Sequence, residues 1–296
     1  MIKNIVMGAG AHDLFIFAGA LDKLIKTEYV KLENIENLYG TSAGALLLVV
    51  IAAKASWEAF VEYIKNKPWD KYWQESTTRG LLNIYNNKGV FDISIIEDAI
   101  IPILKSVGLK STVTFKELYE HSKIKYNIYA FNLNTFTSEC FNYENTPDLE
   151  VIKGIYMSSS FPILFSPMYY NDSYYLDGGV HIDCPIDQCL KDHKNEETVC
   201  IRKLCPIRPL KMKLLKEATL LDFGLLFIKK LVANTRKMDD MKFENTVVFT
   251  GEELILDDFM KIVADKETRG KSIELGRDLG DKYLIKKLKN GVNELC

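Results

Sequence analysis

Residues 35–53 have the sequence IENLYGTSAGALLLVVIAA, and this stretch decides the fold. A short strand is expected at Ile35–Tyr39 and a long apolar-then-amphipathic helix over Ser42–Ile64. Between them, Gly40-Thr41-Ser42-Ala43-Gly44 fits the pattern G-x-S-x-G, which in this strand-turn-helix setting exposes a nucleophilic serine. The flanking glycines leave room for close backbone approach, and the helix N-terminus favours a developing negative charge. The alternative is that five small residues merely begin a helix.

A similar pattern stands at the beginning of the chain. The apolar segment Ile2–Met7 runs into Gly8-Ala9-Gly10, and apolar residues at helical spacing follow over Leu14–Ile25. The first 64 residues therefore predict strand, turn and helix twice in succession. This alternation is typical of an α/β fold with a parallel sheet covered by helices, in which ligands bind at the carboxyl ends of the strands.

The turn at Gly8-Ala9-Gly10 is a candidate anion site. Successive small residues allow backbone N–H groups to converge on one point, and beside an elbow serine such a loop is a natural oxyanion hole. A dinucleotide fingerprint, G-x-G-x-x-G, would need glycine at position 13, where Asp13 stands instead. A plain tight turn remains the other interpretation.

The rest of the chain predicts more strands and helices of the same kind. A hairpin is expected around Asn134, and the strand Tyr174–Leu176 leads into Asp177-Gly178-Gly179. From about residue 252 the chain is charged and helical. The further expected helices are Ile93–Ser106, Phe115–His121 and Leu149–Ser158, and the further strands are Tyr126–Asn132, Thr137–Tyr143, Thr198–Leu204 and Thr246–Thr250.

Composition excludes several classes of protein. The chain has 296 residues, 47% of them hydrophobic and 26% charged, so it is no disordered chain. A net charge of -2, with six arginines, argues against a nucleic-acid partner. The longest apolar run, Ala43–Ala53, is too short to span a bilayer, and His12 and Asp13 interrupt what would be a signal sequence. We therefore expect a cytoplasmic protein.

Cysteines and histidines offer competing sites. The pairs Cys184/Cys189 and Cys200/Cys205 invite a zinc interpretation, but the spacing and the prolines beside them favour ordinary thiols in loops, so no metal and no cofactor is expected. Three histidines follow Ser42. His121 and His193 are expected as solvated surface residues, whereas His181, four residues after Asp177, is expected in a loop.

An ordered set of motifs carries a family resemblance. Besides the glycine loop and the elbow, the chain has Gly19-Ala20-Leu21 in the first helix, Ser158-Ser159-Ser160-Phe161-Pro162, and Asp177-Gly178-Gly179 followed by Cys184-Pro185. In this order, over residues 4–187, the chain resembles the patatin-like phospholipases.

The resemblance implies a three-layer α/β/α fold and a serine–aspartate dyad. Carried over by position, Ser42 is the nucleophile and Asp177 the general base, and Gly8, Ala9, Gly10 and Ala43 supply oxyanion N–H groups. The chain departs from the family where Ala9 replaces a glycine, and where His12 and Asp13 stand in place of a basic residue and a glycine. That change weakens the expectation of phosphate recognition.

The expected protein is a lipid acyl hydrolase acting on phospholipids or lysophospholipids. Residues 1–250 would form the hydrolase domain, with a helical region, 251–296, packed on it. Basic residues over Arg202–Lys216 beside apolar Leu220–Val232 suit peripheral contact with an anionic membrane, although a core-facing helix with a solvated loop would look the same. The rival functions are another serine esterase or acyltransferase using His181, and a silent lipid-binding protein.

Overall fold

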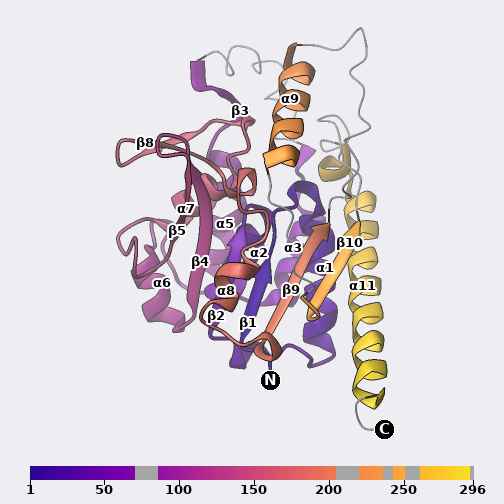
Figure 1. The fold of residues 1–296 in the computed structure, drawn as a ribbon. Coiled ribbons are helices and arrows are strands. Elements are labelled where there is room, and N and C mark those ends of the chain that lie inside the picture. The colour runs from indigo at the N-terminus through magenta and orange to yellow at the C-terminus, as the bar shows by residue number, and fades with distance from the viewer. Residues whose placement is uncertain (71–85, 205–219, 236–242, 251–260, 294–296) are drawn as a thin grey trace.

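A mainly parallel sheet forms the centre of the molecule (Figure 1). The computed structural model describes residues 1–70, 86–204, 220–235, 243–250 and 261–293. Within these ranges the central sheet has eight strands in the order β10-β9-β1-β2-β4-β8-β7, with β5 paired to β4. Its strands are β1 (Asn4–Met7), β2 (Asn37–Thr41), β4 (Lys125–Asn132), β5 (Thr137–Phe141), β7 (Met168–Tyr170), β8 (Ser173–Asp177), β9 (Thr198–Leu204) and β10 (Thr246–Thr250).

The sheet changes direction at β4. Strands β10, β9, β1, β2 and β4 are parallel to one another, whereas β5 and β8 run antiparallel to β4 and β7 antiparallel to β8. A small separate sheet pairs β3 (Gly89–Phe91) with β6 (Ile163–Phe165). The expected α/β class and the hairpin around Asn134 are confirmed, because β4 and β5 flank that turn.

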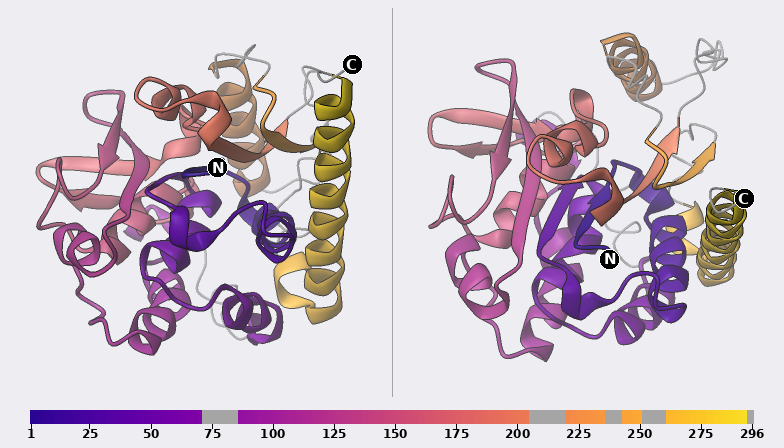
Figure 2. Two further views of the ribbon diagram at one scale, coloured as in Figure 1. Left: turned by 90° about the horizontal axis from the view of Figure 1, so that it is seen from below. Right: turned by 60° about the horizontal axis from the view of Figure 1, so that its bottom comes forward.

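Helices cover the two faces of the sheet unequally, as the turned views in Figure 2 show. Along β1, Ile5 and Met7 point into the main core, and Val6 points into a smaller cluster beneath the short α8 (Ile186–Leu190). Since both faces of β1 are buried, its apolar residues Ile5, Val6 and Met7 follow one another without polar alternation. The helices that contribute to the main core include α1 (Leu14–Lys26), α2 (Ala43–Ala52), α3 (Trp57–Asn66), α5 (Ser94–Ser106), α6 (Phe115–Ser122) and α7 (Val151–Ser159).

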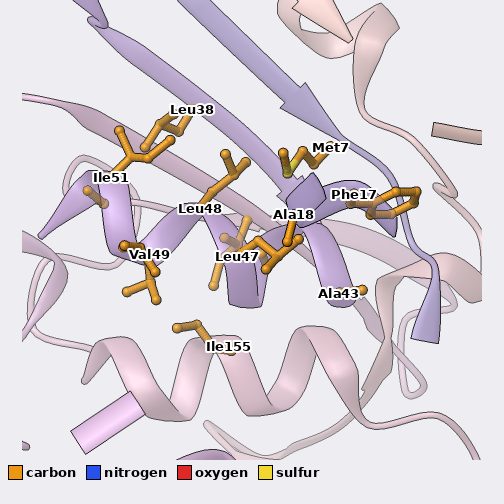
Figure 3. Packing of buried hydrophobic residues seen from close by; sticks show 14 of the residues in the cluster. Met7, Phe17, Ala18, Leu38, Ala43, Leu47, Leu48, Val49, Ile51 and Ile155 are labelled. Carbon is orange, nitrogen blue, oxygen red and sulfur yellow. The ribbon is translucent and has the colours of Figure 1, made fainter. Parts of the chain in front are cut away.

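The helix after the elbow, α2, is almost entirely buried. Nearly every residue of α2 is inaccessible, so it is apolar all round instead of amphipathic. In Figure 3, Leu48 and Ile51 of α2 point toward the sheet, where Leu38 of β2 lies, and Val49 points the other way, toward Ile155 of α7. The helix that directly follows Ser42 is thus fixed by packing on several sides.

The long helix predicted over Ser42–Ile64 is in fact two helices. The first, α2, ends at Ala52, and Lys54 then adopts a left-handed conformation with φ 54°. The second, α3, begins after Ser56, whose hydroxyl accepts the Ala59 N–H at 3.2 Å. A serine N-cap supplies the acceptor that a new helix start needs. The apolar pattern concealed this break because neither Gly nor Pro marks it.

The last described helix, α11 (Lys266–Asn293), packs along α1. Glycines set the distance between them: a Cβ on Gly19 would stand 1.9 Å from the Ile273 carbonyl oxygen, and one on Gly276 would stand 2.0 Å from that of Ile16. Polar contacts flank this crossing. Arg277 Nε pairs with the Asp22 carboxylate at 2.7 Å, and the Tyr29 and Tyr283 hydroxyls are 2.8 Å apart.

Some expectations fall outside the described ranges. Between α3 and β3 the sequence Trp69–Gly89 is polar, aromatic and irregular, which predicts an excursion from the sheet, and only its two ends are described. Most of the basic segment Arg202–Lys216 also lies outside the described residues, which resume at α9 (Leu220–Thr235). Cys205 and Cys296 also lie outside.

We predict that Gly276→Ala lowers the free energy of unfolding by about 1–3 kcal/mol, because its methyl group would collide with the Ile16 carbonyl and force α1 and α11 apart. The matched control is Gly270→Ala on the same helix, whose Cβ would have its nearest neighbour, Lys65 Cε, at 3.5 Å. This control is expected to be neutral or stabilising by up to about 1 kcal/mol, since alanine favours helix. Urea unfolding measures both. Equal effects would contradict the close packing.

Candidate active site

Two strands that meet end to end along β4 create the site. Strand β2 pairs with the first part of β4, ending with Thr41 opposite Tyr129, and β8 pairs with the second part, ending with Asp177 opposite Ala130. Both lie on the same edge, because β5 occupies the other edge over residues that overlap each of them. Ser42 directly follows Thr41. Strand register therefore brings together the two predicted turns, Gly40–Gly44 with Ser42 and Asp177–Gly179 with the aspartate.

A short hydrogen bond joins these two turns. The Ser42 hydroxyl donates to Asp177 Oδ2 at 2.7 Å, and the second oxygen, Oδ1, accepts the Gly179 N–H at 2.7 Å. Ser42 is 7% exposed and Asp177 5%. The Asp177 N–H also donates to the Ser160 carbonyl at 2.9 Å. The carboxylate is thus held on two sides with one oxygen directed at the serine.

The serine itself stands in a strained turn. Ser42 has φ 53° and ψ −117°, a region that costs a non-glycine residue about 1–3 kcal/mol and is found mostly at functional sites. Ser158 of α7 supports it: its hydroxyl accepts the Ser42 N–H at 3.0 Å and donates to the Tyr129 carbonyl at 2.6 Å. One buried serine therefore links the elbow to β4.

The predicted motif glycines stand where backbones nearly touch. A Cβ on Gly44 would lie 2.3 Å from the Met7 carbonyl oxygen, and one on Gly178 would lie 2.1 Å from that of Tyr129. On Gly40 it would meet the backbone of Ala45 at 2.7 Å. Gly179 contributes its N–H to Asp177. A larger residue at Gly44 would push the elbow away from β1, one at Gly178 would push the Asp177 turn away from β4, and one at Gly40 would collide with the first turn of α2.

The glycine loop adjoins the elbow, but two of the N–H groups predicted as oxyanion donors, those of Gly8 and Ala9, already donate to other backbone carbonyls. The Gly44 N–H donates to the Gly8 carbonyl at 3.2 Å, which ties the loop to the start of α2. The Gly8 N–H continues the ladder with β9 by donating to Ile201, and the Ala9 N–H donates to Asp183 at 2.7 Å. Within the described chain, the N–H groups of Gly10 and Ala43 have no protein acceptor. Of the four predicted oxyanion donors, Gly10 and Ala43 are therefore the two whose N–H groups remain available to a substrate.

A buried ion pair lies behind this loop. Lys203 Nζ is 2.8 Å from one Asp13 oxygen and His12 Nε2 is 3.3 Å from the other, with the Asp13 and Lys203 side chains only 5% and 10% exposed. Burial raises the pKa of Asp13, but hydrogen bonds and charge from His12 and Lys203 outweigh it and bring the pKa below its ordinary value. The loop thus carries a neutralised carboxylate.

The histidines bond elsewhere. His181 Nδ1 is 2.8 Å from the Ser138 hydroxyl, and the ring lies against Phe131. His193 bonds to the Tyr39 hydroxyl at 3.1 Å, and His121 to the Ala53 carbonyl at 3.2 Å. The Ser42 hydroxyl bonds to Asp177 rather than to a histidine.

The described cysteines gather on the thinly covered face of the sheet. Cys184 and Cys200 have their sulfurs 3.4 Å apart, and burial raises the pKa of Cys140 to about 11 and of Cys189 to about 12. Such thiols are neutral at ordinary pH and pack as small apolar groups. In the part of the chain that the structure describes, no three His, Cys, Asp or Glu side chains cluster as metal ligands would.

Two supporting residues were not identified from the sequence. Ser158 belongs to the motif Ser158–Pro162, but its bond to the Ser42 N–H depends on a contact across 116 positions. Lys203 belongs to the basic stretch Arg202–Lys216, yet its partner Asp13 lies 190 positions away. The one signal in the sequence is Asp13 itself, an acidic residue directly after the glycine loop, which needs a cationic partner if it is buried.

Sequence comparison places the chain in a family. The pattern of the family described as "Patatin-like phospholipase" matches residues 5–190, well over half of the chain. The chain belongs to this family, and the resemblance inferred from its motifs is confirmed.

Two viral proteins are similar in sequence. The chain is 28% identical over 200 residues to "Probable lipid hydrolase 463L" of Invertebrate iridescent virus 6, which covers 66% of this chain and 65% of that protein. It is 25% identical over 185 residues to "Uncharacterized protein R571" of Acanthamoeba polyphaga mimivirus, which covers 62% and 60%. The chain thus spans somewhat less than two thirds of either relative.

Two solved structures share the fold. VipD from Legionella pneumophila superposes with a TM-score of 0.54 at 14% identity, over 96% of this chain and 67% of VipD. ExoU, in its complex with SpcU from Pseudomonas aeruginosa, gives a TM-score of 0.50 at 18% identity, over 97% of this chain and 52% of the other. These likenesses concern the fold alone.

We predict that Ser158→Ala slows phosphonate labelling of Ser42 about tenfold or more and costs about 1–3 kcal/mol of stability, because it leaves a buried N–H without an acceptor. The neighbouring Ser159→Ala is the matched control, since the Ser159 hydroxyl is buried and has no hydrogen-bond partner. Labelling rates and urea unfolding measure the two effects. Equal rates in both variants would show that Ser158 does not position the elbow.

We also predict that Lys203→Met costs about 3–5 kcal/mol, because the Asp13 carboxylate is left buried without its nearest cation. The double variant Asp13→Asn/Lys203→Met is expected to recover most of the loss. Because the pKa of Asp13 is lowered on folding, its contribution is complete above the unfolded value and is lost as pH falls through the folded value. Additive losses in a double-mutant cycle would contradict the pairing.

Proposed function

We propose that the chain is a lipid acyl hydrolase with Ser42 as nucleophile and Asp177 as general base. One observation carries the proposal: the hydroxyl of a serine in a strained elbow donates to a buried carboxylate at 2.7 Å. Membership of the patatin-like phospholipase family, and the similarity to a viral protein named a probable lipid hydrolase, support the substrate class.

The proposed reaction has two steps. Ser42 Oγ attacks the ester carbonyl carbon while its proton passes to Asp177, and the same proton leaves with the departing alcohol as an acyl-enzyme forms. Water then gives a proton to Asp177 and attacks the acyl carbon, and that proton returns to Ser42 as the fatty acid leaves. An aspartate of ordinary pKa, about 3.9, is a weak base. A fixed geometry and a stabilised oxyanion are therefore essential.

The N–H groups of Gly10 and Ala43 are the proposed oxyanion donors. Both lie at the corner where the Gly8 carbonyl meets the start of α2, and neither is engaged by another acceptor in the described chain. Each preorganised donor stabilises such a transition state by about 3 kcal/mol. Gly8 and Ala9 have their N–H groups bonded to β9 and Asp183, so in this proposal they shape the loop.

The proposed substrates are phospholipids or lysophospholipids, reached by peripheral contact with a membrane. The reaction uses the side chains and water, so no cofactor is invoked, and the near-neutral charge gives no reason to invoke nucleic acid. No helix among the described residues has the length and apolarity to cross a bilayer. We propose residues 1–250 as the hydrolase domain with 251–296 packed on it. The packing of α11 on α1 supports that arrangement.

We predict that Ser42→Ala and Asp177→Asn each lower ester hydrolysis by about 10³-fold or more, because each removes one half of the proton transfer. His181→Ala serves as the matched control, since its ring bonds to Ser138, and is expected to retain activity. Rates with a phospholipid and with a soluble ester, and unfolding of each variant, measure the outcome.

The two rival functions give opposite results. Activity kept in Asp177→Asn but lost in His181→Ala would establish a serine–histidine esterase or acyltransferase. A wild-type chain that hydrolyses no ester and does not react with a serine-directed phosphonate would be a silent lipid-binding protein.

A further inference from the structure

One side of α11 packs on α1, and the opposite side is exposed along its length. The buried side is formed by Ile273, Gly276, Gly280 and Tyr283. The exposed side, the α11 stripe, is formed by Lys271, Glu274, Leu275, Asp278, Lys282, Ile285, Lys286 and Lys289. Spacings of three and four residues keep these side chains on one side of the helix. Figures 1 and 2 show α11 at the edge of the molecule, with no described helix or strand on its outer side.

Charge along the α11 stripe is divided between the two halves of the helix. Glu274 and Asp278 lie in the first half, and Lys282, Lys286 and Lys289 in the second. The helix dipole favours such a division only within the first and last turns, whereas Asp278 and Lys282 stand near the middle of a 28-residue helix. Among the described residues, Asp278, Lys282 and Lys286 form no ion pair. The charges of the stripe are therefore largely available to a partner.

A groove of about 830 Å³ lies beside the acidic half of the stripe. Lys65, at the end of α3, and Gly270 form part of its lining, and Gly270 leaves it open because it has no side chain. Leu275, which is 47% exposed, and Asp278 line it as well. The groove thus offers an apolar contact next to a carboxylate, which suits an apolar side chain flanked by lysines.

The basic half of the same helix has these features. When two copies of α11 lie antiparallel, with a two-fold axis beside Gly280, Glu274 faces the partner's Lys286 and Asp278 faces the partner's Lys282. Each contact then occurs twice, as in any two-fold interface. A parallel arrangement would place each charge opposite its own copy. The stripe is therefore complementary to itself in the antiparallel direction.

The apolar residues of the stripe follow the same register. Leu275 faces the partner's Ile285, and both side chains are about half exposed in the single chain. One pair has like charges, because Lys271 faces the partner's Lys289, but Lys271 is already bound to Glu267 at 2.7 Å. Residues seven apart, such as Lys271, Asp278 and Ile285, stay on the seam between two helices that pack side by side.

We propose that the chain forms an antiparallel homodimer through the α11 stripe. A second copy fits better than an anionic surface or nucleic acid, because half of the stripe is acidic. One stripe of eight residues is small beside the 20–30 residues per side of a standard interface, so the dimer is weak and reversible. Opposite charges then determine the orientation of the two helices more than the strength of the contact. This inference is independent of the proposed function.

A charge swap in the full chain tests the proposal. Glu274→Lys and Lys286→Glu are each expected to weaken dimerisation at least about tenfold, because each creates two like-charged contacts. The double variant Glu274→Lys/Lys286→Glu restores opposite charges and is expected to regain wild-type dimerisation. The two positions are more than three turns apart, so they do not pair within one helix. Sedimentation velocity over a range of protein concentrations measures the dimer.

The apolar contact has its own variant. Leu275→Ser/Ile285→Ser is expected to weaken dimerisation at least about tenfold, because it removes both apolar contacts of the seam. The control is Glu120→Lys, which reverses an exposed charge on α6 and is expected to dimerise as wild type does. Urea unfolding and phosphonate labelling of Ser42 check the fold of each variant.

Several outcomes would overturn the inference. They are a wild-type chain that stays monomeric at concentrations approaching a millimolar, single charge reversals that leave the dimer unchanged, as a parallel arrangement requires, and a double variant that fails to recover. Phosphonate labelling is expected to be the same in all variants. A monomeric chain that labels at Ser42 would therefore remove the dimer and leave the proposed function standing.

Discussion

The arrangement on which the site depends is the sharing of one edge of β4 by two strands of opposite direction. Strand β2 ends opposite Tyr129 and β8 ends opposite Ala130, so the residues at their ends become neighbours. Register in a buried sheet is strongly specified, because a slip of one position turns every side chain to the other face. The 2.7 Å contact between Ser42 and Asp177 is therefore maintained by two hydrogen-bonded ladders rather than by a loop.

The strained elbow is stabilised by its surroundings. Ser42 adopts a left-handed φ of 53°, which the isolated chain would avoid. The conformation persists because Ser158 accepts its N–H, the Gly44 N–H reaches the Gly8 carbonyl, and the apolar α2 is packed on several sides (Figure 3). The strained backbone of Ser42 thus adjoins the buried helix α2, which keeps the serine hydroxyl in place before a substrate arrives.

Sequence reasoning succeeded where the signal is local and missed what depends on distant contacts. Glycines, a serine and an aspartate at turn positions predicted both corners of the site, because those backbones tolerate few other residues. The Ser42–Asp177 contact that the register on β4 creates, the Lys203–Asp13 pair and the engagement of the Ala9 N–H by Asp183 all involve partners over a hundred positions apart. The break at Lys54 was missed for another reason: no glycine or proline marks it.

The glycine-mediated contact of α11 with α1 has a consequence for how the chain acquires its structure. The helix that follows the first strand finds its partner only after more than two hundred further residues have been made, and β1 likewise waits for β9 to complete its ladder. During synthesis, the apolar strand and helix at the front of the chain therefore remain uncovered on one side. Such long-range closure is expected to slow folding and to leave apolar surface exposed to aggregation until α11 packs on α1.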